Sequence, residues 1–180
     1  MDRVITQWSV LTGAPCSGKT SVLRSLQQEG YPVRDECSRA YFDEELRKGR
    51  KLEEICANQR ALQRMFLTLG LEQDETLDPL RPYVLDRSPV DAIAHHMLFG
   101  FERADAVQEA SRFRYRRVFH FAALPFAQDG VRSETVEQAA ELDRCFAAAY
   151  QELGYDIIPV PFMSIVRRTA LVRSHLQAQF

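Results

Sequence analysis

Lysine is rare in this chain, although basic residues are not. Among 23 lysines and arginines only Lys19, Lys48 and Lys51 are lysines, and none follows residue 51. GTPases normally read guanine with an Asn-Lys-x-Asp segment after a later strand, so this chain cannot contain that segment. The scarcity also makes the lysine within a glycine-rich motif, Lys19, harder to attribute to chance.

Neither sign of charge is in strong excess, since the formal net charge is −2. Proteins that coat nucleic acids usually carry a strong basic excess, so this class is disfavoured, although a local basic patch stays open. The cysteines are scattered, without a CxxC pair or histidines at metal-ligand spacing. This pattern indicates reduced thiols rather than a zinc or disulfide framework. The four are Cys16, Cys37, Cys56 and Cys145.

No apolar run approaches the ~20 residues that a membrane-spanning helix needs, and the first residues carry no long apolar segment. We therefore expect no membrane span and no signal peptide, and a cytoplasmic location. Apolar material for a core is nevertheless plentiful, since 46% of the 180 residues are hydrophobic. That length and composition suit one domain spanning residues 1–180.

Short apolar runs alternate with longer segments of helical periodicity, which is typical of βαβ proteins. The expected strands are residues 8–12, 31–36, 83–85, 117–124 and 155–160. The expected helices are residues 19–29, 39–48, 52–73, 88–101, 135–153 and 164–179. We expect a three-layer α/β/α fold whose parallel five-stranded sheet has the order 2-3-1-4-5.

Residues 13–20, GAPCSGKT, match the phosphate-binding pattern GxxxxGK[ST], with a strand before and a helix after. The glycines let backbone N–H groups turn inward as an anion nest, and the helix N-terminus adds partial positive charge. Lys19 is expected to reach the β- and γ-phosphates, and the Thr20 hydroxyl to coordinate Mg²⁺. ATP is the expected nucleotide, because the guanine-reading segment is absent. The expected nucleotide-binding residues are Gly13, Ala14, Pro15, Cys16, Ser17, Gly18, Lys19, Thr20 and Ser21.

Asp86 ends the third expected strand, at the sheet edge where open α/β proteins place their ligands. A carboxylate at this place can hold Mg²⁺ or its water, as in other P-loop proteins. We therefore expect Thr20 and Asp86 to form the metal site.

Four segments together resemble a known family, in order and spacing: LTGAPCSGKTSVL, GYPVRDECSRAYF, YVLDRSPVDAIAHH and the stretch from ALPFAQDGVRSE to YDIIPVP. The chain resembles the small bacterial P-loop ATPase/kinase proteins labelled "AAA domain", and is similar to the ribosylnicotinamide kinase domain. The resemblance covers nearly the whole chain. The family usually has glycine at the position of Cys16, where a side chain restricts the backbone more tightly.

The resemblance implies roles for two arginines. Asp86-Arg87-Ser88 is similar to the acidic-Arg-Ser segment of deoxynucleoside kinases, which implies that Arg87 contacts phosphate and substrate hydroxyls. Arg132 lies in a loop, about residues 126–135, where the resembling kinases carry a lid. A lid arginine would close over the phosphates and neutralise charge that develops during transfer.

Glu36 ends the second expected strand, where small-molecule kinases commonly place their general base, and Arg39 follows three residues later. Arg39 would then steady the acceptor or the transferred phosphate. Asp35 is an adjacent competitor that points the other way if the strand continues through it. Asp86 is a third candidate base, and a purely structural Glu36–Arg39 pair also stays open.

Several residues have a plain structural explanation beside a functional one. Asp91 suits helix capping fully, and substrate contact is the alternative. His95 and His96 are expected to be packing or surface residues, and the Arg112–Arg117 run a solvated helix end. Gln59, Arg60 and Arg64 are expected on the surface of a helix that lines the acceptor pocket in similar kinases.

These features favour ATP- and Mg²⁺-dependent phosphoryl transfer to a hydroxyl of a small molecule, with a nucleoside or related metabolite as the expected acceptor. One alternative is a regulatory P-loop ATPase that acts on a protein partner. Another is a polynucleotide 5′-kinase that binds its strand with the Arg112–Arg117 cluster. A nucleic-acid substrate is disfavoured but open, and the sequence leaves the oligomeric state undetermined.

Overall fold

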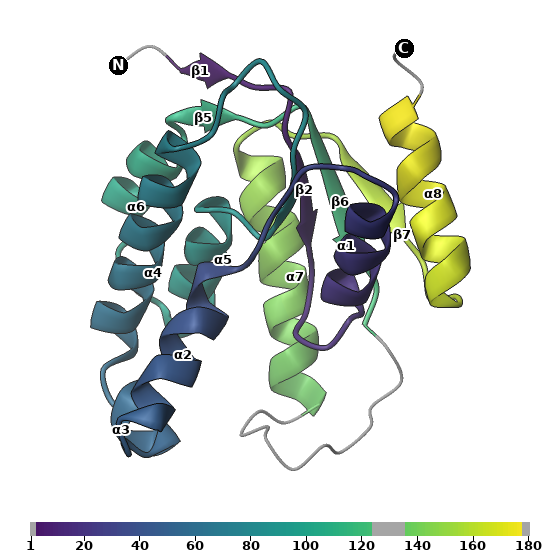
Figure 1. Ribbon diagram of the computed structural model, residues 1–180. Coiled ribbons are helices and arrows are strands. Elements are labelled where there is room, and N and C mark those ends of the chain that lie inside the picture. The colour runs from purple at the N-terminus through teal and green to yellow at the C-terminus, as the bar shows by residue number, and fades with distance from the viewer. Residues whose placement is uncertain (1–2, 124–135, 178–180) are drawn as a thin grey trace.

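Five parallel strands form the central sheet, in the order β3-β4-β2-β6-β7 (Figure 1). The structure is a computed structural model that describes residues 3–123 and 136–177. In chain order the five strands are β2 (Ser9–Thr12), β3 (Val33–Arg34), β4 (Val84–Asp86), β6 (Arg117–Phe121) and β7 (Ile157–Val160). This confirms the predicted order 2-3-1-4-5.

Strand β2 lies at the centre, and all four of its residues are buried. Ser9 aligns with Val84 of β4 on one side and with Arg117 of β6 on the other. A parallel sheet is covered on both faces, so its strands read as continuous apolar runs rather than as alternating patterns. Because all five strands run the same way, the segments that follow them gather at one edge of the sheet.

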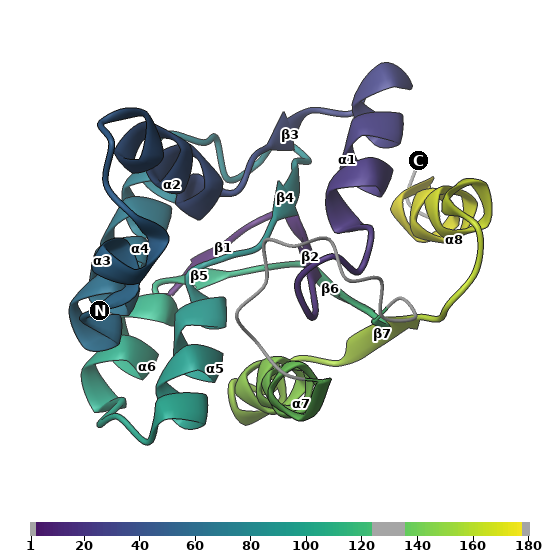
Figure 2. The same cartoon turned by 90° about the horizontal axis from the view of Figure 1, so that it is seen from below.

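Helices cover both faces of the sheet, as Figure 2 shows. On one face lie α1 (Lys19–Gln28) and α8 (Ile165–Gln177), and on the other lie α5 (Val90–Phe99) and α7 (Val136–Glu152). Beside α5 pack α4 (Gln59–Glu75) and α6 (Ala104–Ala110), with α2 (Cys37–Arg47) and α3 (Leu52–Cys56) at the outer end of α4. Two apolar cores result, one on each face, and they confirm the three-layer prediction.

The predicted helix over residues 52–73 is wrong in one respect, because the chain breaks it into α3 and α4. Asn58 precedes α4, and its side-chain oxygen accepts a hydrogen bond from the N–H of Ala61 at 3.0 Å. Asparagine is among the residues that cap a helix N-terminus best, since it satisfies a backbone donor that has no partner within the helix. The capping signal was therefore present within the apolar periodicity that suggested one long helix.

A small second sheet and helix α6 were not predicted. Strands β1 (Val4–Ile5) and β5 (Phe113–Arg114) pair in parallel beyond the amino ends of the central strands. Trp8 anchors this region, because its buried ring lies 5.2 Å from that of Phe113 and its Nε1 donates to the Asp78 carbonyl at 3.1 Å. Two-residue strands are too short to give a periodic signal.

Within residues 3–123 and 136–177, no helix combines the length and the apolar character that crossing a membrane requires.

Candidate active site

Positive φ angles give the turn after β2 its inward curl. Gly13 has φ 122°, and a Cβ there would lie 2.5 Å from the carbonyl oxygen of Phe121, so no larger residue fits. Gly18 has φ 86°, and Cys16 has φ 55° with an exposed side chain. A left-handed backbone costs a residue with a Cβ roughly 1–2 kcal/mol, which is why glycine suits the position of Cys16 better.

Lys19 begins α1 and folds back over this loop. Its Nζ donates to the carbonyl oxygens of Gly13 and Ala14 at 3.0 and 2.8 Å and to Ser17 Oγ at 3.1 Å. The side chain is only 5% exposed. Burial, together with the positive charge of Arg87, lowers the pKa of Lys19 to about 8. A cation confined in this way suits a phosphate chain, whose negative charge would replace the carbonyl contacts.

Thr20 and Asp86 lie next to each other, as the predicted metal site requires. Thr20 Oγ1 donates to Asp86 Oδ2 at 2.7 Å, whereas the buried Asp86 Oδ1 has no partner among the described residues. Burial raises the pKa of Asp86 despite the nearby Lys19 charge. Mg²⁺ usually keeps several waters and takes one or two protein oxygens plus phosphate oxygens, and this pair fits that requirement. The described residues hold no group of three or more His, Cys, Asp or Glu side chains suited to a metal.

Arg87 joins three segments of the site. Its Nε lies 2.9 Å from Glu36 Oε1, its Nη1 donates to Asp91 Oδ2 at 3.3 Å, and its guanidinium lies 4.8 Å from the ring centroid of Phe146. The residue has φ 65°, a conformation that is uncommon for a side chain of this size. The two carboxylates raise the pKa of Arg87 in spite of its burial, so it stays a cation.

Glu36 is placed where the sequence predicted a general base, but its partner differs. Oε1 accepts from Ser38 Oγ and pairs with Arg87, which leaves Oε2 outside these contacts. Burial raises the pKa of Glu36, but Arg87, Ser38 and Lys19 outweigh this and hold it below its ordinary value. Glu36 is therefore ionised near neutral pH. Arg39 is exposed on α2, and the ion pair of Glu36 among the described residues is with Arg87 instead.

The other two acidic candidates, Asp35 and Asp91, differ in burial and in partners. Asp35 is exposed and pairs with Arg24 at 2.8 Å on the surface, away from the loop. Asp91 is buried in the first turn of α5, where its Oδ1 accepts from Thr12 Oγ1 at 2.7 Å and its Oδ2 from Arg87. The side chain of Asp91 thus contacts the end of β2 and Arg87, and helix capping does not explain these contacts.

A buried ion pair supports the Asp86–Arg87 turn from beneath. Arg34 Nη2 lies 2.9 Å from Asp74 Oδ1, and Tyr115 donates its hydroxyl to Asp74 Oδ2 at 2.8 Å. The same guanidinium donates to the carbonyl oxygens of Asp86 and Arg87 at 3.3 and 3.1 Å. These bonds hold the backbone in the positive-φ conformation that presents Arg87 to the two carboxylates.

A cavity of about 620 Å³ extends from the phosphate loop between α2, α4 and α5. Its inner end carries Pro15, Glu36, Asp86, Arg87 and Asp91. Its outer end is apolar and aromatic with two amides, and is formed mainly by Phe42, Gln59, Leu62, Gln63, Phe66, Leu98 and Phe99. Such a mixture of apolar walls with a few polar groups is typical of small-molecule sites.

Three further residues line the cavity, although no sequence motif marks them as site residues. His95 lines the cavity, and burial together with Arg87 lowers its pKa to about 3, so it is neutral. Gln59 also faces the cavity rather than only the helix surface, and Gln63, 6% exposed, was not singled out. Gln59 and Gln63 are spaced so that they lie on one face of α4, and this spacing is the sequence signal that could have identified both. Arg60 and Arg64 instead contact Phe101 and Glu109 outside the cavity.

Helix α7 contributes a carboxylate to the phosphate loop that the sequence did not reveal. Asp143 Oδ1 accepts from the N–H of Ala14 at 3.0 Å and lies 3.2 Å from His120 Nε2 at the end of β6. Burial raises the pKa of Asp143, but His120 and the Ala14 N–H outweigh this and lower it overall. No local motif links these distant residues, so only the fold brings them together.

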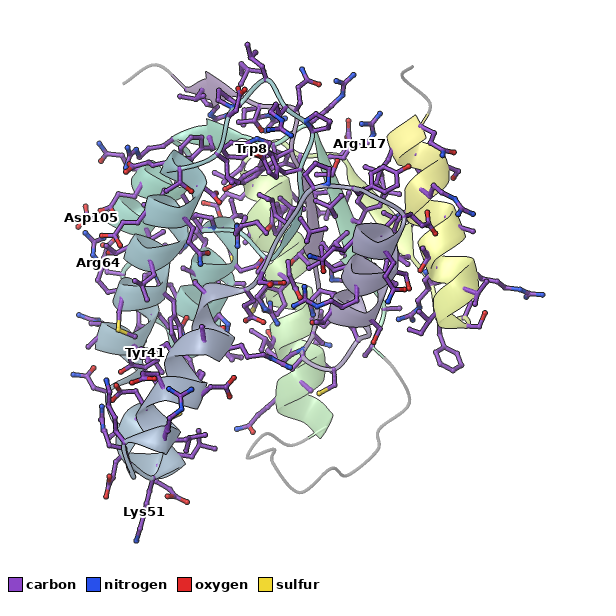
Figure 3. All side chains as sticks on the ribbon, in the orientation of Figure 1. Trp8, Tyr41, Lys51, Arg64, Asp105 and Arg117 are labelled. Atoms are coloured by element: carbon purple, nitrogen blue, oxygen red, sulfur yellow. The ribbon has the colours of Figure 1, made fainter. Side chains whose placement is uncertain are left out.

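The Arg112–Arg117 run lies at the opposite end of the sheet from the phosphate loop, as the positions of Arg117 and Trp8 in Figure 3 indicate. Arg112 pairs with Glu75, and Arg114 donates to the carbonyl of Leu153 at 2.8 Å.

The predicted lid loop, about residues 126–135, and its Arg132 lie outside the described residues.

Comparisons with known proteins agree with this geometry. The profile of the family described as "AAA domain" matches residues 8–168. No curated protein sequence matches the chain. Among solved structures, NadR in complex with NR superposes with a TM-score of 0.68 at 14% identity, covering 97% of this chain and 53% of that chain. The present chain therefore spans about half of the NadR chain.

Two further similar structures are covered almost completely. Thymidylate kinase from Ehrlichia chaffeensis has a TM-score of 0.67 at 14% identity, with 97% of this chain and 100% of that chain covered. Deoxyadenosine kinase from M. mycoides has a TM-score of 0.64 at 15% identity, with 95% and 99% covered. These likenesses concern the fold, whereas the profile match extends over most of the sequence. The chain belongs to the AAA domain family, and its fold is that of the P-loop kinases.

Proposed function

We propose that this protein catalyses ATP- and Mg²⁺-dependent phosphoryl transfer to a hydroxyl of a nucleoside-like small molecule. The observation that carries the proposal is a cavity that runs from the phosphate loop to an aromatic recess. At the junction between them lie an ionised carboxylate, Glu36, and a paired guanidinium, Arg87. A regulatory ATPase needs no such second compartment.

At the phosphate end, the backbone N–H groups of residues 16–21 and the amine of Lys19 would hold the triphosphate of ATP, because Pro15 has no N–H and that of Ala14 donates to Asp143. Thr20 and Asp86 would hold Mg²⁺, which when bound neutralises phosphate charge. Arg132 remains a predicted lid residue that would approach the same phosphates. Phosphoryl transfer depends mainly on positioning and on fixed charge, so few reactive side chains are required.

At the acceptor end, Glu36 would accept the proton of the attacking hydroxyl through Oε2, while Arg87 fixes Oε1. Arg87 is itself held by Asp91 and by the ring of Phe146, so the carboxylate has a defined orientation. Exposed Asp35 is the weaker candidate base because its carboxylate pairs with Arg24 on the surface. Arg39, on the exposed side of α2, would need to move inward to reach the acceptor.

The charges of the cavity favour an acceptor without a phosphate group. Glu36, Asp86 and Asp91 are acidic, whereas the basic lining residues are Arg87 and Arg34, and Arg34 is already paired with Asp74. Even with Asp86 bound to Mg²⁺, Glu36 and Asp91 share the single cation Arg87, so a monophosphate acceptor would meet an excess of negative charge. A neutral hydroxyl compound with a flat ring suits the rest of the cavity.

The recess beyond this junction favours a ring with polar edges. Phe42, Phe66 and Phe99 offer aromatic surface, and Gln59 and Gln63 offer amide donors and acceptors. A nucleoside combines such a ring with hydroxyl groups. The polynucleotide-kinase alternative loses its main support, because the Arg112–Arg117 run lies at the far end of the sheet.

The test is ADP formation by the purified protein across acceptors that separate the alternatives: nucleosides, the matching 5′-monophosphates, sugars, amino alcohols and 5′-hydroxyl oligonucleotides. We expect one or more nucleosides to raise the rate well above the acceptor-free rate, and their monophosphates to raise it far less. Lys19→Met is the control and should lose about 10²–10³-fold or more of the stimulated rate. Stimulation by oligonucleotides alone, or by no acceptor, would overturn the proposal.

A further inference from the structure

Arg168 of α8 is a fully buried arginine that sits directly behind the phosphate loop. Its exposed fraction is 0%. Its Nη1 donates to the carbonyl oxygen of Ser17, its Nε to that of Pro161 at 3.0 Å and its Nη2 to that of Ala122 at 3.2 Å. One guanidinium thus ties the phosphate loop to the segments that follow β6 and β7.

The charge of Arg168 has no ionic partner within residues 3–123 and 136–177. No carboxylate of the described residues lies within salt-bridge distance of it, and its other neighbours are the rings of Phe121 and Phe162, at 5.7 and 6.0 Å. Burial lowers the pKa of Arg168, but an arginine stays protonated at any physiological pH. Burying an unpaired cation is costly unless other groups compensate it. Three carbonyl oxygens do so only in part.

The contact with Ser17 has a geometric consequence for the loop. A trans peptide unit is planar, so its carbonyl and its N–H point in opposite directions. Arg168 fixes the Ser17 carbonyl on the outer side of the loop, and the N–H of Gly18 in the same peptide unit is therefore directed to the inner side. Gly18 has φ 86°, which continues this inward curl. Polarisation of the carbonyl by a cation also strengthens the N–H as a donor.

We propose that Arg168 is a positioning residue of the phosphate loop, which fixes the Gly18 N–H toward the phosphates and adds a positive charge behind them that no carboxylate of the described residues pairs with. The inference rests on the proposed binding of ATP at this loop. Its distinctive consequence is that the contribution of Arg168 grows with the negative charge of the ligand. A purely structural role would affect all nucleotides alike.

The test is the affinity of Arg168→Gln for ATP, ADP and AMP, measured by calorimetry with Mg²⁺ present. Glutamine keeps a donor but removes the charge. We expect about a tenfold or larger loss for ATP, a smaller loss for ADP and the smallest for AMP. The matched control is Arg167→Gln, which removes the same charge from an exposed neighbour on the same helix and should change each affinity by less than about twofold.

Arg168→Lys keeps the charge and should lose less than about threefold of the ATP affinity. This variant also decides the case if Arg168→Gln does not fold, because a tenfold loss with lysine would contradict the charge argument. Equal losses for ATP, ADP and AMP, or no loss at all, would overturn the proposal. Failure of the unmodified protein to bind MgATP would instead overturn the proposed function.

Discussion

Lys19 has a charge that depends on pH close to neutrality. Its pKa is about 8 in the folded protein, against an ordinary value of 10.5. Because the folded pKa is depressed, the unfolded chain binds more protons between these values, and this lysine adds stability as pH rises from about 8. Phosphate binding has the opposite dependence, since it favours the charged amine.

We therefore predict that ATP affinity falls about tenfold between pH 7 and pH 9, and that binding at pH 8–9 takes up protons. Calorimetry in two buffers of different ionisation enthalpy measures the uptake. Lys19→Met should abolish it, whatever affinity remains. Proton release on binding, or uptake that persists in Lys19→Met, would show that another group controls the pH dependence.

Glu36 is the side chain that distinguishes transfer from binding. Glu36→Gln keeps the size and a hydrogen-bonding oxygen but cannot accept a proton, so the acceptor-dependent rate should fall about 10²–10⁴-fold with little change in MgATP affinity. Steady-state ADP formation and calorimetry measure the two. Asp35→Asn, on the adjacent surface residue, is the control and should stay within about threefold. An unaffected rate in Glu36→Gln would remove the base role from this residue.

Cys16 offers a chemical probe of the phosphate loop. Its side chain is exposed, whereas Cys145 is buried and Cys37 and Cys56 are half-buried. Burial also raises the pKa of Cys37 and of Cys145, which lowers their thiolate fraction. Cys16 should therefore react fastest with an alkylating reagent, and bound MgATP should protect it. Mass spectrometry of the labelled cysteines measures both, and equal Cys16 labelling with and without MgATP would contradict the assignment of the loop.

At the scale of elements, the apolar runs and the turn and capping residues around them predicted most of the architecture. The GAPCSGKT turn, the LDRS strand end and the helix over residues 19–29 follow from local sequence, because a glycine loop and a buried parallel strand each leave a continuous local signal. The α3–α4 break depended on one capping residue, Asn58, within a long periodic segment. The β1–β5 pair depends on contacts between residues more than 100 positions apart, which no local pattern records.

The residues of the site also fall into two groups, those that local motifs predict and those that only the fold brings together. Lys19, Thr20, Asp86 and Arg87 were accessible from motifs, whereas Arg34, Asp143 and Arg168 act through long-range bonds to backbone groups. Arg34 lies in the short strand β3, and no sequence motif marks it. Its partner Asp74 lies 40 residues away on α4, so the ion pair exists only once that helix packs against the sheet.

The network around Asp74 supports a prediction on stability. Tyr115→Phe removes the hydroxyl that donates to Asp74 Oδ2 and leaves a buried carboxylate with one partner fewer. We expect a loss of about 1–3 kcal/mol in the free energy of unfolding. Chemical denaturation measures it, with Tyr83→Phe as control, because Tyr83 is only half-buried and phenylalanine keeps its ring contact with Arg81, so the change should cost little. A cost of Tyr115→Phe no larger than that of the control would contradict the supporting role of Asp74.

At the scale of the whole molecule, the parallel sheet brings the ends of β2, β3, β4 and β6 to one edge, and the phosphate loop and the cavity both lie there. Helices α2, α4 and α5 then enclose the acceptor end, while α1 and α8 support the loop from the other face (Figure 2). The proposed function assigns a triphosphate to the phosphate loop and a neutral ring compound to the adjoining cavity. Transfer between them is the central claim.

The most direct measurement of that claim is the fate of the γ-phosphate. The protein would be incubated with Mg²⁺ and ATP labelled in the γ-phosphate, together with the nucleoside that most stimulates ADP formation. The products would then be separated and counted. We predict that label appears on the nucleoside in a one-to-one ratio with ADP, and that Glu36→Gln suppresses it. Label that accumulates only as inorganic phosphate while ADP forms would contradict the account and identify the protein as an ATPase.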